Sequence, residues 1–144
     1  MENFLLIDAL EREFLIDLLF SLICGLVIGF ERERRNKPAG ISTHTLVIGA
    51  AMLFTFLSRT VNAGDPTRIA AQIVSGVGFL GAGIILKSET TGKVTNLTTA
   101  ASVWYSAAIG MALGFNYHFI GLVATLYVVI INRIPNFRRD KDKY

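Results

Sequence analysis

The sequence predicts an all-α, polytopic membrane protein with five transmembrane helices in one bundle. Of its 144 residues 52% are hydrophobic and 17% are charged, whereas a soluble domain usually carries about 25% charge. The segment from Ile69 to Leu86 holds 18 consecutive uncharged residues, and about 20 mostly apolar residues cross a bilayer. Four further apolar segments are separated by short polar loops. We therefore expect no room for a separate soluble domain.

The first apolar segment is preceded by an acidic stretch and the last is followed by a basic one. Residues 1–13 are predicted to form an interfacial segment, residues 14–134 the five-helix membrane domain, and residues 135–144 a basic cytoplasmic tail. The start of the chain has neither the basic residues nor the small-residue cleavage site of a signal peptide. The five spans are predicted at 14–30, 43–57, 66–86, 97–113 and 117–134.

Polar residues mark the expected starts of three spans. Ser42 is a plausible N-cap of the second span, and Asp65-Pro66 is a strong start signal for the third. Thr95 or Asn96 is expected to cap the fourth.

Basic residues predict the orientation of the chain. Eleven of the 14 lysines and arginines lie in the first loop, the third loop or the tail, and three (Arg12, Arg59 and Arg68) lie on the other side. Because lysine and arginine are enriched in cytoplasmic loops, we expect the N-terminus outside and the C-terminus in the cytoplasm.

Glycines are concentrated in the segment Ile69–Leu86, which we expect to be the close-packed central helix. Small residues let membrane helices approach closely, so Gly81→Leu is expected to disrupt assembly more than Gly114→Leu. The match to GxGxxG at Gly76–Gly81 lies inside an apolar span, so packing is favoured over nucleotide binding. The predicted packing positions are Gly25, Gly29, Gly76, Gly78, Gly81 and Gly83.

The predicted topology brings polar residues from four span ends to the cytoplasmic face. Two helix N-termini point there, and such ends suit an anion or a carboxylate, for which Glu31 is a candidate. We expect Glu31 to approach Thr98 and Thr99. The candidate functional polar cluster comprises Glu31, Arg32, Arg35, Thr43, His44, Asn96, Thr98 and Thr99.

Three residues within the predicted spans are candidates for an intramembrane polar role: Asp17, Gln72 and Trp104. An intramembrane acid is a functional hypothesis by default, but Asp17 lies near a boundary, so a structural hydrogen bond or snorkelling is favoured over an ion ligand. Gln72 is expected to join helices by a hydrogen bond. Trp104 lies in mid-span, so its N–H should have a protein partner.

Several classes of function lack the residues they need. A single cysteine, Cys24, excludes an internal disulfide, and no nucleophile–base pair or metal cage indicates an enzyme or a cofactor. Carboxylates are split between the two membrane faces, so no midplane magnesium site is evident and any metal ligand stays unknown. No basic face interleaved with aromatics indicates nucleic-acid binding.

Four sequence blocks, in order and spacing, resemble the MgtC/SapB family of bacterial inner-membrane proteins. They are Gly25-Leu-Val-Ile-Gly29-Phe-Glu31-Arg32-Glu33, then Pro38-Ala39-Gly40 with Thr43-His44-Thr45-Leu46-Val47, then Arg68–Gly83, and last Leu97–Trp104 with Ala107–Gly110. The Arg68–Gly83 block is highly specific.

The resemblance implies a five-span, multi-pass domain in the bacterial inner (plasma) membrane, linked to magnesium homeostasis, virulence and inhibition of the F-type ATP synthase. Many members carry a cytoplasmic, often ACT-like C-terminal domain, for which we expect this chain to end too soon. Ser42 and Thr95-Asn96 depart from the family's usual Arg and Arg-Gly. Any charge pair with Glu31 must therefore be built differently, from Arg32, from Arg35 or from the counterpart of Arg68 in a partner protomer.

The function expected from the sequence is modulation of magnesium, other ion or proton homeostasis through a membrane-protein partner or a homo-oligomer in the lipid bilayer. The alternative is a carrier or channel for Mg²⁺ or another cation, formed by an oligomer.

Overall fold

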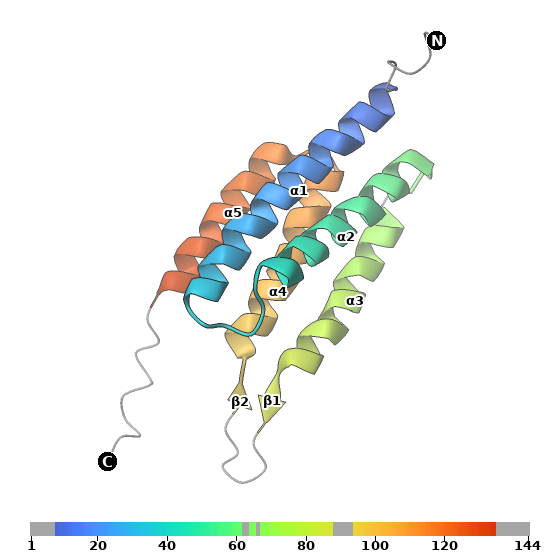
Figure 1. Cartoon of the computed structure of the whole chain (residues 1–144). Coiled ribbons are helices and arrows are strands. Elements are labelled where there is room, and N and C mark those ends of the chain that lie inside the picture. The colour runs from blue at the N-terminus through green and yellow to red at the C-terminus, as the bar shows by residue number, and fades with distance from the viewer. Residues whose placement is uncertain (1–7, 62–63, 66, 88–93, 135–144) are drawn as a thin grey trace, which may run out of the picture.

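The computed structural model describes residues 8–61, 64–65, 67–87 and 94–134. The described residues form five helices: α1 (Ala9–Arg34), α2 (Ile41–Val61), α3 (Thr67–Ile84), α4 (Leu97–Gly114) and α5 (His118–Arg133). They run alongside one another as a single bundle (Figure 1). The predicted all-α membrane bundle is thus confirmed.

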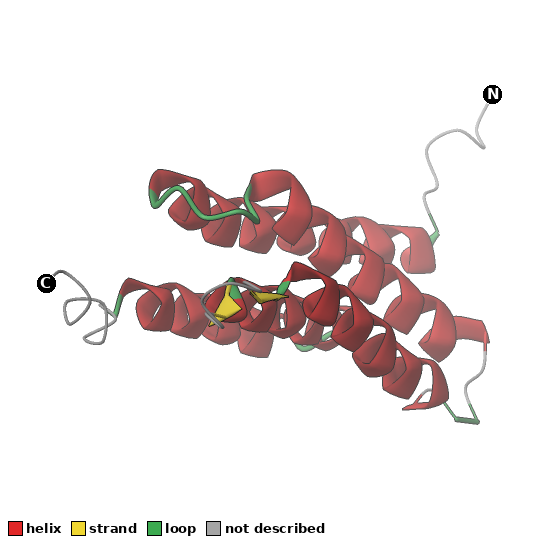
Figure 2. Cartoon of the chain, turned by 90° about the horizontal axis from the view of Figure 1, so that it is seen from below, coloured by secondary structure: helices red, strands yellow, loops and turns green. Residues whose placement is uncertain are grey.

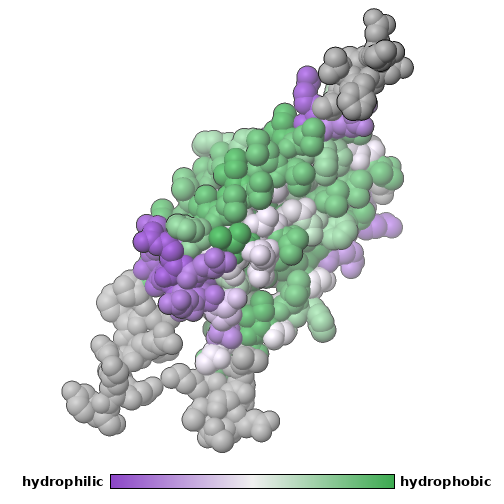
Figure 3. All heavy atoms as spheres, viewed as in Figure 1, coloured by the Kyte–Doolittle hydropathy of each residue, from purple (hydrophilic) through white to green (hydrophobic). Residues whose placement is uncertain are grey.

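Three helices, α1, α2 and α3, are long and apolar enough to cross a membrane, and α5 is a shorter apolar helix. Large apolar side chains point outward from the bundle, including Leu19, Phe30 and Ile130. They form a broad apolar surface between two hydrophilic ends (Figure 3). Such a surface suits hydrocarbon on the outside of the bundle.

Two short strands follow α3 and precede α4. Strand β1 (Leu86–Lys87) pairs antiparallel with β2 (Val94–Thr95), so that Leu86 is opposite Thr95. Figure 2 shows this pair as the only regular non-helical structure in the described part of the chain. It lies beyond the end of α3, on the same end of the bundle as the last turn of α1 (Figure 1).

The helix starts differ from several predictions. Helix α1 begins at Ala9, where Asp8 and Glu11 form a capping box, so residues 9–13 belong to the same helix as the first predicted span. Helix α2 begins at Ile41, whose N–H is accepted by Glu33 Oε1 at 2.9 Å, and Ser42 is not its cap. Asn96 is the N-cap of α4 in a left-handed conformation, without a side-chain capping bond.

The centre of the bundle is α4, not α3 as the sequence suggested. Ten residues of α4 are buried, and it contacts each of the other four helices. In α3 only Ala70, Ile73 and Gly81 are buried. The expectation was wrong because a glycine-rich surface predicts close approach but not which partner provides it.

The glycines that are closely packed against the backbone of another helix lie on α1 and α4, and not on α3 as expected. A Cβ added to Gly25 or Gly29 would overlap the backbone of α2, and one added to Gly110 or Gly114 would overlap the same helix further along. A Cβ added to Gly76, Gly78 or Gly83 would meet no atom within 4 Å among the described residues, and at Gly81 it would only touch Ala100 at 3.9 Å. The expected greater sensitivity of Gly81 than of Gly114 is therefore contradicted.

Candidate functional site

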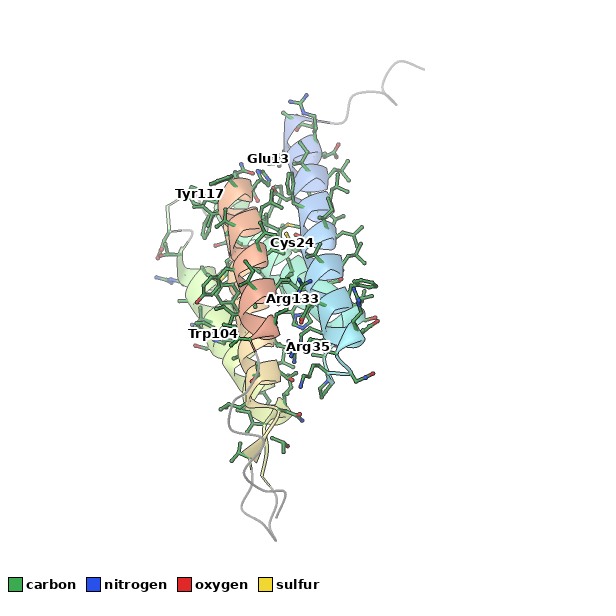
Figure 4. The ribbon with its side chains drawn as sticks, turned by 90° about the vertical axis from the view of Figure 1, so that its left-hand side faces the viewer. Glu13, Cys24, Arg35, Trp104, Tyr117 and Arg133 are labelled. Carbon is green, nitrogen blue, oxygen red and sulfur yellow. The ribbon has the colours of Figure 1, made fainter. Side chains whose placement is uncertain are left out.

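The first buried polar group, here called the Arg32 cluster, lies where α1 ends. Its residues come from four helices that meet at this end of the bundle: Glu31, Arg32, Arg35, His44, Thr99, Ser102, Ser106 and Asn132. Arg35 and Arg133 mark the level of this end in Figure 4.

Arg32 is the most buried charged residue of this cluster, with 1% of its surface exposed. Its Nη2 donates to Thr99 Oγ1 at 2.6 Å, so it ties α1 to the first turn of α4. Among the described residues its Nε has no hydrogen-bond partner, and no carboxylate lies within ion-pair distance. A guanidinium so placed retains unused donor capacity inside the bundle.

Glu31 pairs within its own helix. Its Oε1 lies 3.4 Å from Arg35 Nη1, and Arg35 also donates to the backbone carbonyl of Asn132 on α5. The other carboxylate oxygen, Oε2, is buried without a partner in the described chain. Arg35 thus supplies the charge partner of Glu31, and the hydrogen bond to Thr99 comes from the neighbouring Arg32.

His44 joins α2 to a row of hydroxyls on α4. The Ser106 hydroxyl donates to the Ser102 carbonyl at 3.0 Å, and His44 Nδ1 lies 2.8 Å from Ser106 Oγ, which assigns Nδ1 as the donor of that second bond. Asn132 Nδ2 reaches Ser102 Oγ at 3.4 Å from α5. His44 Nε2 is left buried without a partner in the described part of the chain.

Some predicted members of this cluster lie outside it. Thr98 is exposed, whereas its neighbour Thr99 is buried. Thr43 is half-buried and Asn96 caps α4, and neither makes a side-chain hydrogen bond within the described chain. Ser106 and Asn132 were missed, although Thr99, Ser102 and Ser106 recur on one face of a helix at spacings of three and four.

A second group, the Asp17 cluster, lies at the opposite end and comprises Glu13, Asp17, Arg59, Asn116 and His118. Asp17 is fully buried, and its Oδ1 accepts from His118 Nε2 at 2.6 Å. Its Oδ2 has no partner among the described residues. The structural hydrogen bond expected for Asp17 is present, but its partner, 101 positions along the chain, was not foreseen.

Charged residues around Asp17 tie three helices together. Arg59 Nη2 lies 2.8 Å from Glu13 Oε1, and Arg59 Nε donates to the Gly114 carbonyl at 3.2 Å. Asn116 donates to the same Glu13 oxygen. Glu13 and Tyr117 mark this end in Figure 4, with Cys24 between the two clusters.

An apolar layer separates the two clusters. It consists of buried side chains that lie between the polar residues on each of four helices: Cys24, Ile28, Ile48, Met52, Phe56, Ile109, Leu113 and Val128. Within its depth, the hydroxyls of Ser21 and Thr125 donate to carbonyls of their own helices. Across the described residues, no group of three His, Cys, Asp or Glu could hold a metal ion.

The other two intramembrane candidates face outward. Gln72 is exposed on α3, and Trp104 is 45% exposed on α4. Neither side chain has a hydrogen-bond partner in the ranges that the structure describes. The partner expected for the Trp104 N–H is thus not found within the described chain.

Comparisons with known proteins agree on one family. The profile described as the MgtC family matches residues 18–139. The chain is 45% identical over 115 residues to Protein MgtC of Brucella abortus, covering 79% of this chain and 48% of that protein. It is 41% identical over 119 residues to Protein MgtC of Salmonella typhimurium, covering 83% and 51%. The chain thus spans about half the length of the curated relatives it matches, and no solved structure matches it.

Proposed function

From the premise that this chain belongs to the MgtC family of membrane proteins, we propose that it modulates magnesium, other ion or proton homeostasis by binding another membrane protein. The F-type ATP synthase, implied by the family resemblance, is the candidate partner. The bacterial inner membrane is the proposed location, with the helices crossing it repeatedly.

The observation that carries this proposal is the apolar layer between the two buried polar clusters. An ion crossing the bundle would have to pass Ile28, Ile48, Met52 and Leu113, all with at most 1% of their surface exposed. Moving an ion through such packing is costly, because it loses hydration without gaining ligands. A binding role needs no such path.

A second observation supports binding. The Arg32 cluster contains two arginines and one carboxylate, so it carries one excess positive charge when its histidine is neutral. Buried charges in membrane proteins are costly and mark functional positions. An acidic or hydrogen-bond-accepting segment of a partner would complement this end of the bundle.

The alternative, a cation carrier formed by an oligomer, is favoured by one feature. Asp17 and Glu31 each keep one buried carboxylate oxygen without a partner in the described chain. Such oxygens are the ligands that Mg²⁺ prefers. In this alternative the polar path would run between subunits instead of through one bundle.

The two proposals differ in what the isolated protein does. In liposomes loaded with a magnesium-sensitive or proton-sensitive dye, the purified chain is expected to produce no more flux than empty liposomes. An ionophore serves as the positive control. Flux that is lost in Asp17→Asn or Glu31→Gln would overturn the binding proposal in favour of the carrier.

The partner is tested in inverted membrane vesicles that contain the ATP synthase. Added chain is expected to lower ATP-driven proton pumping, and an unrelated five-helix membrane protein at the same level should not. The synthase should also be retained on the tagged chain after purification in mild detergent. Unchanged pumping together with no retention would exclude this partner.

A further inference from the structure

One side of α3, here called the α3 outer face, holds four polar or small residues beside one phenylalanine, where a lipid-facing helix would be expected to carry apolar residues throughout. It consists of residues spaced by three or four along the helix: Gln72, Ser75, Gly76, Phe79 and Gly83. All five are exposed, and they lie opposite the buried side of α3 that contains Ala70, Ile73 and Gly81. This face therefore points away from the rest of the bundle.

Gln72 is the residue of this face least suited to lipid. It is the sixth residue of α3, which at 1.5 Å per residue places it roughly 8 Å inside the helix start. Its carboxamide has no hydrogen-bond partner within the described residues. An amide left unpaired in hydrocarbon is unfavourable, so the position calls for a partner from outside the bundle.

Trp104 lies on α4, beside α3 (Figure 4). It lines an apolar groove of about 150 Å³ between α3 and α4, together with Val74, Val77, Ala107, Ala108 and Met111. As the eighth of 18 residues in α4 it lies in mid-span, away from the interfaces where tryptophan usually lies. Its indole N–H also lacks a partner in the described chain. Because Val74 and Val77 lie on the side of α3 that carries Ala70 and Ile73, this groove is separate from the α3 outer face.

We propose that the α3 outer face is the surface through which two copies of this chain associate in the membrane. A two-fold axis along the membrane normal places Gln72 opposite Gln72 of the second copy at the same depth. A carboxamide both donates and accepts, so this residue complements itself. Among the described residues no atom lies within 4 Å of a Cβ added to Gly76 or Gly83, so these glycines let the two helices approach closely.

Charge complementarity at the start of α3 also favours a second copy. Arg68 Nε lies 3.6 Å from Asp65 Oδ2, and the two side chains are 79% and 49% exposed. Opposite charges so close on one helix end can exchange partners across a two-fold axis, each arginine facing the aspartate of the other copy. The dimer goes beyond the proposed function, since it is compatible with a regulator as well as with a carrier.

Disulfide crosslinking in native membranes tests the contact directly. Gly76→Cys and Phe79→Cys are expected to form an oxidant-dependent species of twice the 15.8 kDa chain mass, because a disulfide needs Cα atoms within about 7 Å. The control is Leu126→Cys on α5, which is 60% exposed and should stay monomeric. The parent chain controls for Cys24, which is buried. Absence of the dimer at both α3 positions, or a crosslinked species of another mass, would overturn the proposal.

Leucine substitutions at two comparable glycines distinguish a loss of dimer contact from a loss of folding. Gly76 on α3 and Gly49 on α2 both have open space around an added Cβ, so leucine should fold at either position. Energy transfer between labelled chains in liposomes should show weaker association for Gly76→Leu and unchanged association for Gly49→Leu.

Gln72→Leu should weaken association roughly three- to twentyfold, the range spanned by interhelical hydrogen bonds in membranes. Equal association of the Gly76 and Gly49 variants, or no effect of Gln72→Leu, would contradict the α3 interface. Neither result depends on ion flux or on the ATP synthase.

Discussion

Arg32 shows how a buried charge in this bundle depends on a single hydroxyl. Its Nη2 donates to Thr99 Oγ1 at 2.6 Å, whereas the neighbouring Thr98 is exposed. Thr99→Val keeps the shape of the side chain but removes the acceptor, and hydrogen bonds to charged groups are worth about 1.5–3 kcal/mol. We expect Thr99→Val to lower the free energy of unfolding in detergent by about that amount, and Thr98→Val to change it little. Equal effects of the two valines would show that the Arg32 contact contributes nothing.

Asp17 and His118 form a pair whose members are costly to separate. His118→Leu leaves a fully buried carboxyl group without its partner, which costs about 1–3 kcal/mol of unfolding free energy. Asp17→Leu combined with His118→Leu removes both polar groups, and such apolar replacements can be nearly neutral. We therefore expect the double variant to be more stable than His118→Leu alone, measured as a double-mutant cycle of unfolding in detergent. Additive losses would contradict the coupling.

At the scale of elements, the contact between α2 and α4 is where glycine is indispensable. A Cβ at Gly114 would lie 2.5 Å from the Met52 carbonyl oxygen and 2.7 Å from Thr55 Cβ, so the helices would have to separate. We expect Gly114→Ala to lower the unfolding free energy by about 1–3 kcal/mol, as overpacking does. Gly78→Ala adds a Cβ in open space and should be neutral or stabilising by up to about 1 kcal/mol. Thermal unfolding of both variants in detergent decides between these expectations, and a greater loss at Gly78 would contradict them.

The elements themselves were largely predictable, but their partners were not. Five helices follow from apolar stretches bounded by polar loops, which are local properties of the sequence. Gly78 and Gly114 look alike in sequence, and only the tertiary arrangement distinguishes the open position from the packed one. The pairing of Glu31 with Arg35 follows from their i,i+4 spacing and was offered by the sequence, whereas the bond from Arg35 to the Asn132 carbonyl depends on how α1 meets α5. The helical spacing of residues predicts which face of a helix is packed, but not which other helix that face contacts.

At the scale of the whole molecule, the charged ends bound an apolar middle. The end of α1 and the end of α5 lie together, while the starts of both helices lie at the other end (Figure 1). Hydrophilic residues gather at these two ends, with the apolar surface between them (Figure 3). The basic residues Arg32, Arg34, Arg35 and Arg133 therefore belong to one end of the bundle. Because basic residues are enriched on the cytoplasmic side, we still predict that this end faces the cytoplasm.

The predicted orientation can be tested with two single cysteines at opposite ends of α2. Pro38→Cys lies in the loop before α2, and Val61→Cys at its last residue, where the side chain is 82% exposed. Because α2 has 21 residues, they lie roughly 30 Å apart along the helix axis, far enough to emerge on different sides of the bilayer. A membrane-impermeant maleimide applied to intact cells should label Val61→Cys at once and Pro38→Cys only after permeabilisation. The parent chain, whose Cys24 is buried, should stay unlabelled. The opposite labelling order would reverse the topology and place the Arg32 cluster on the outer side.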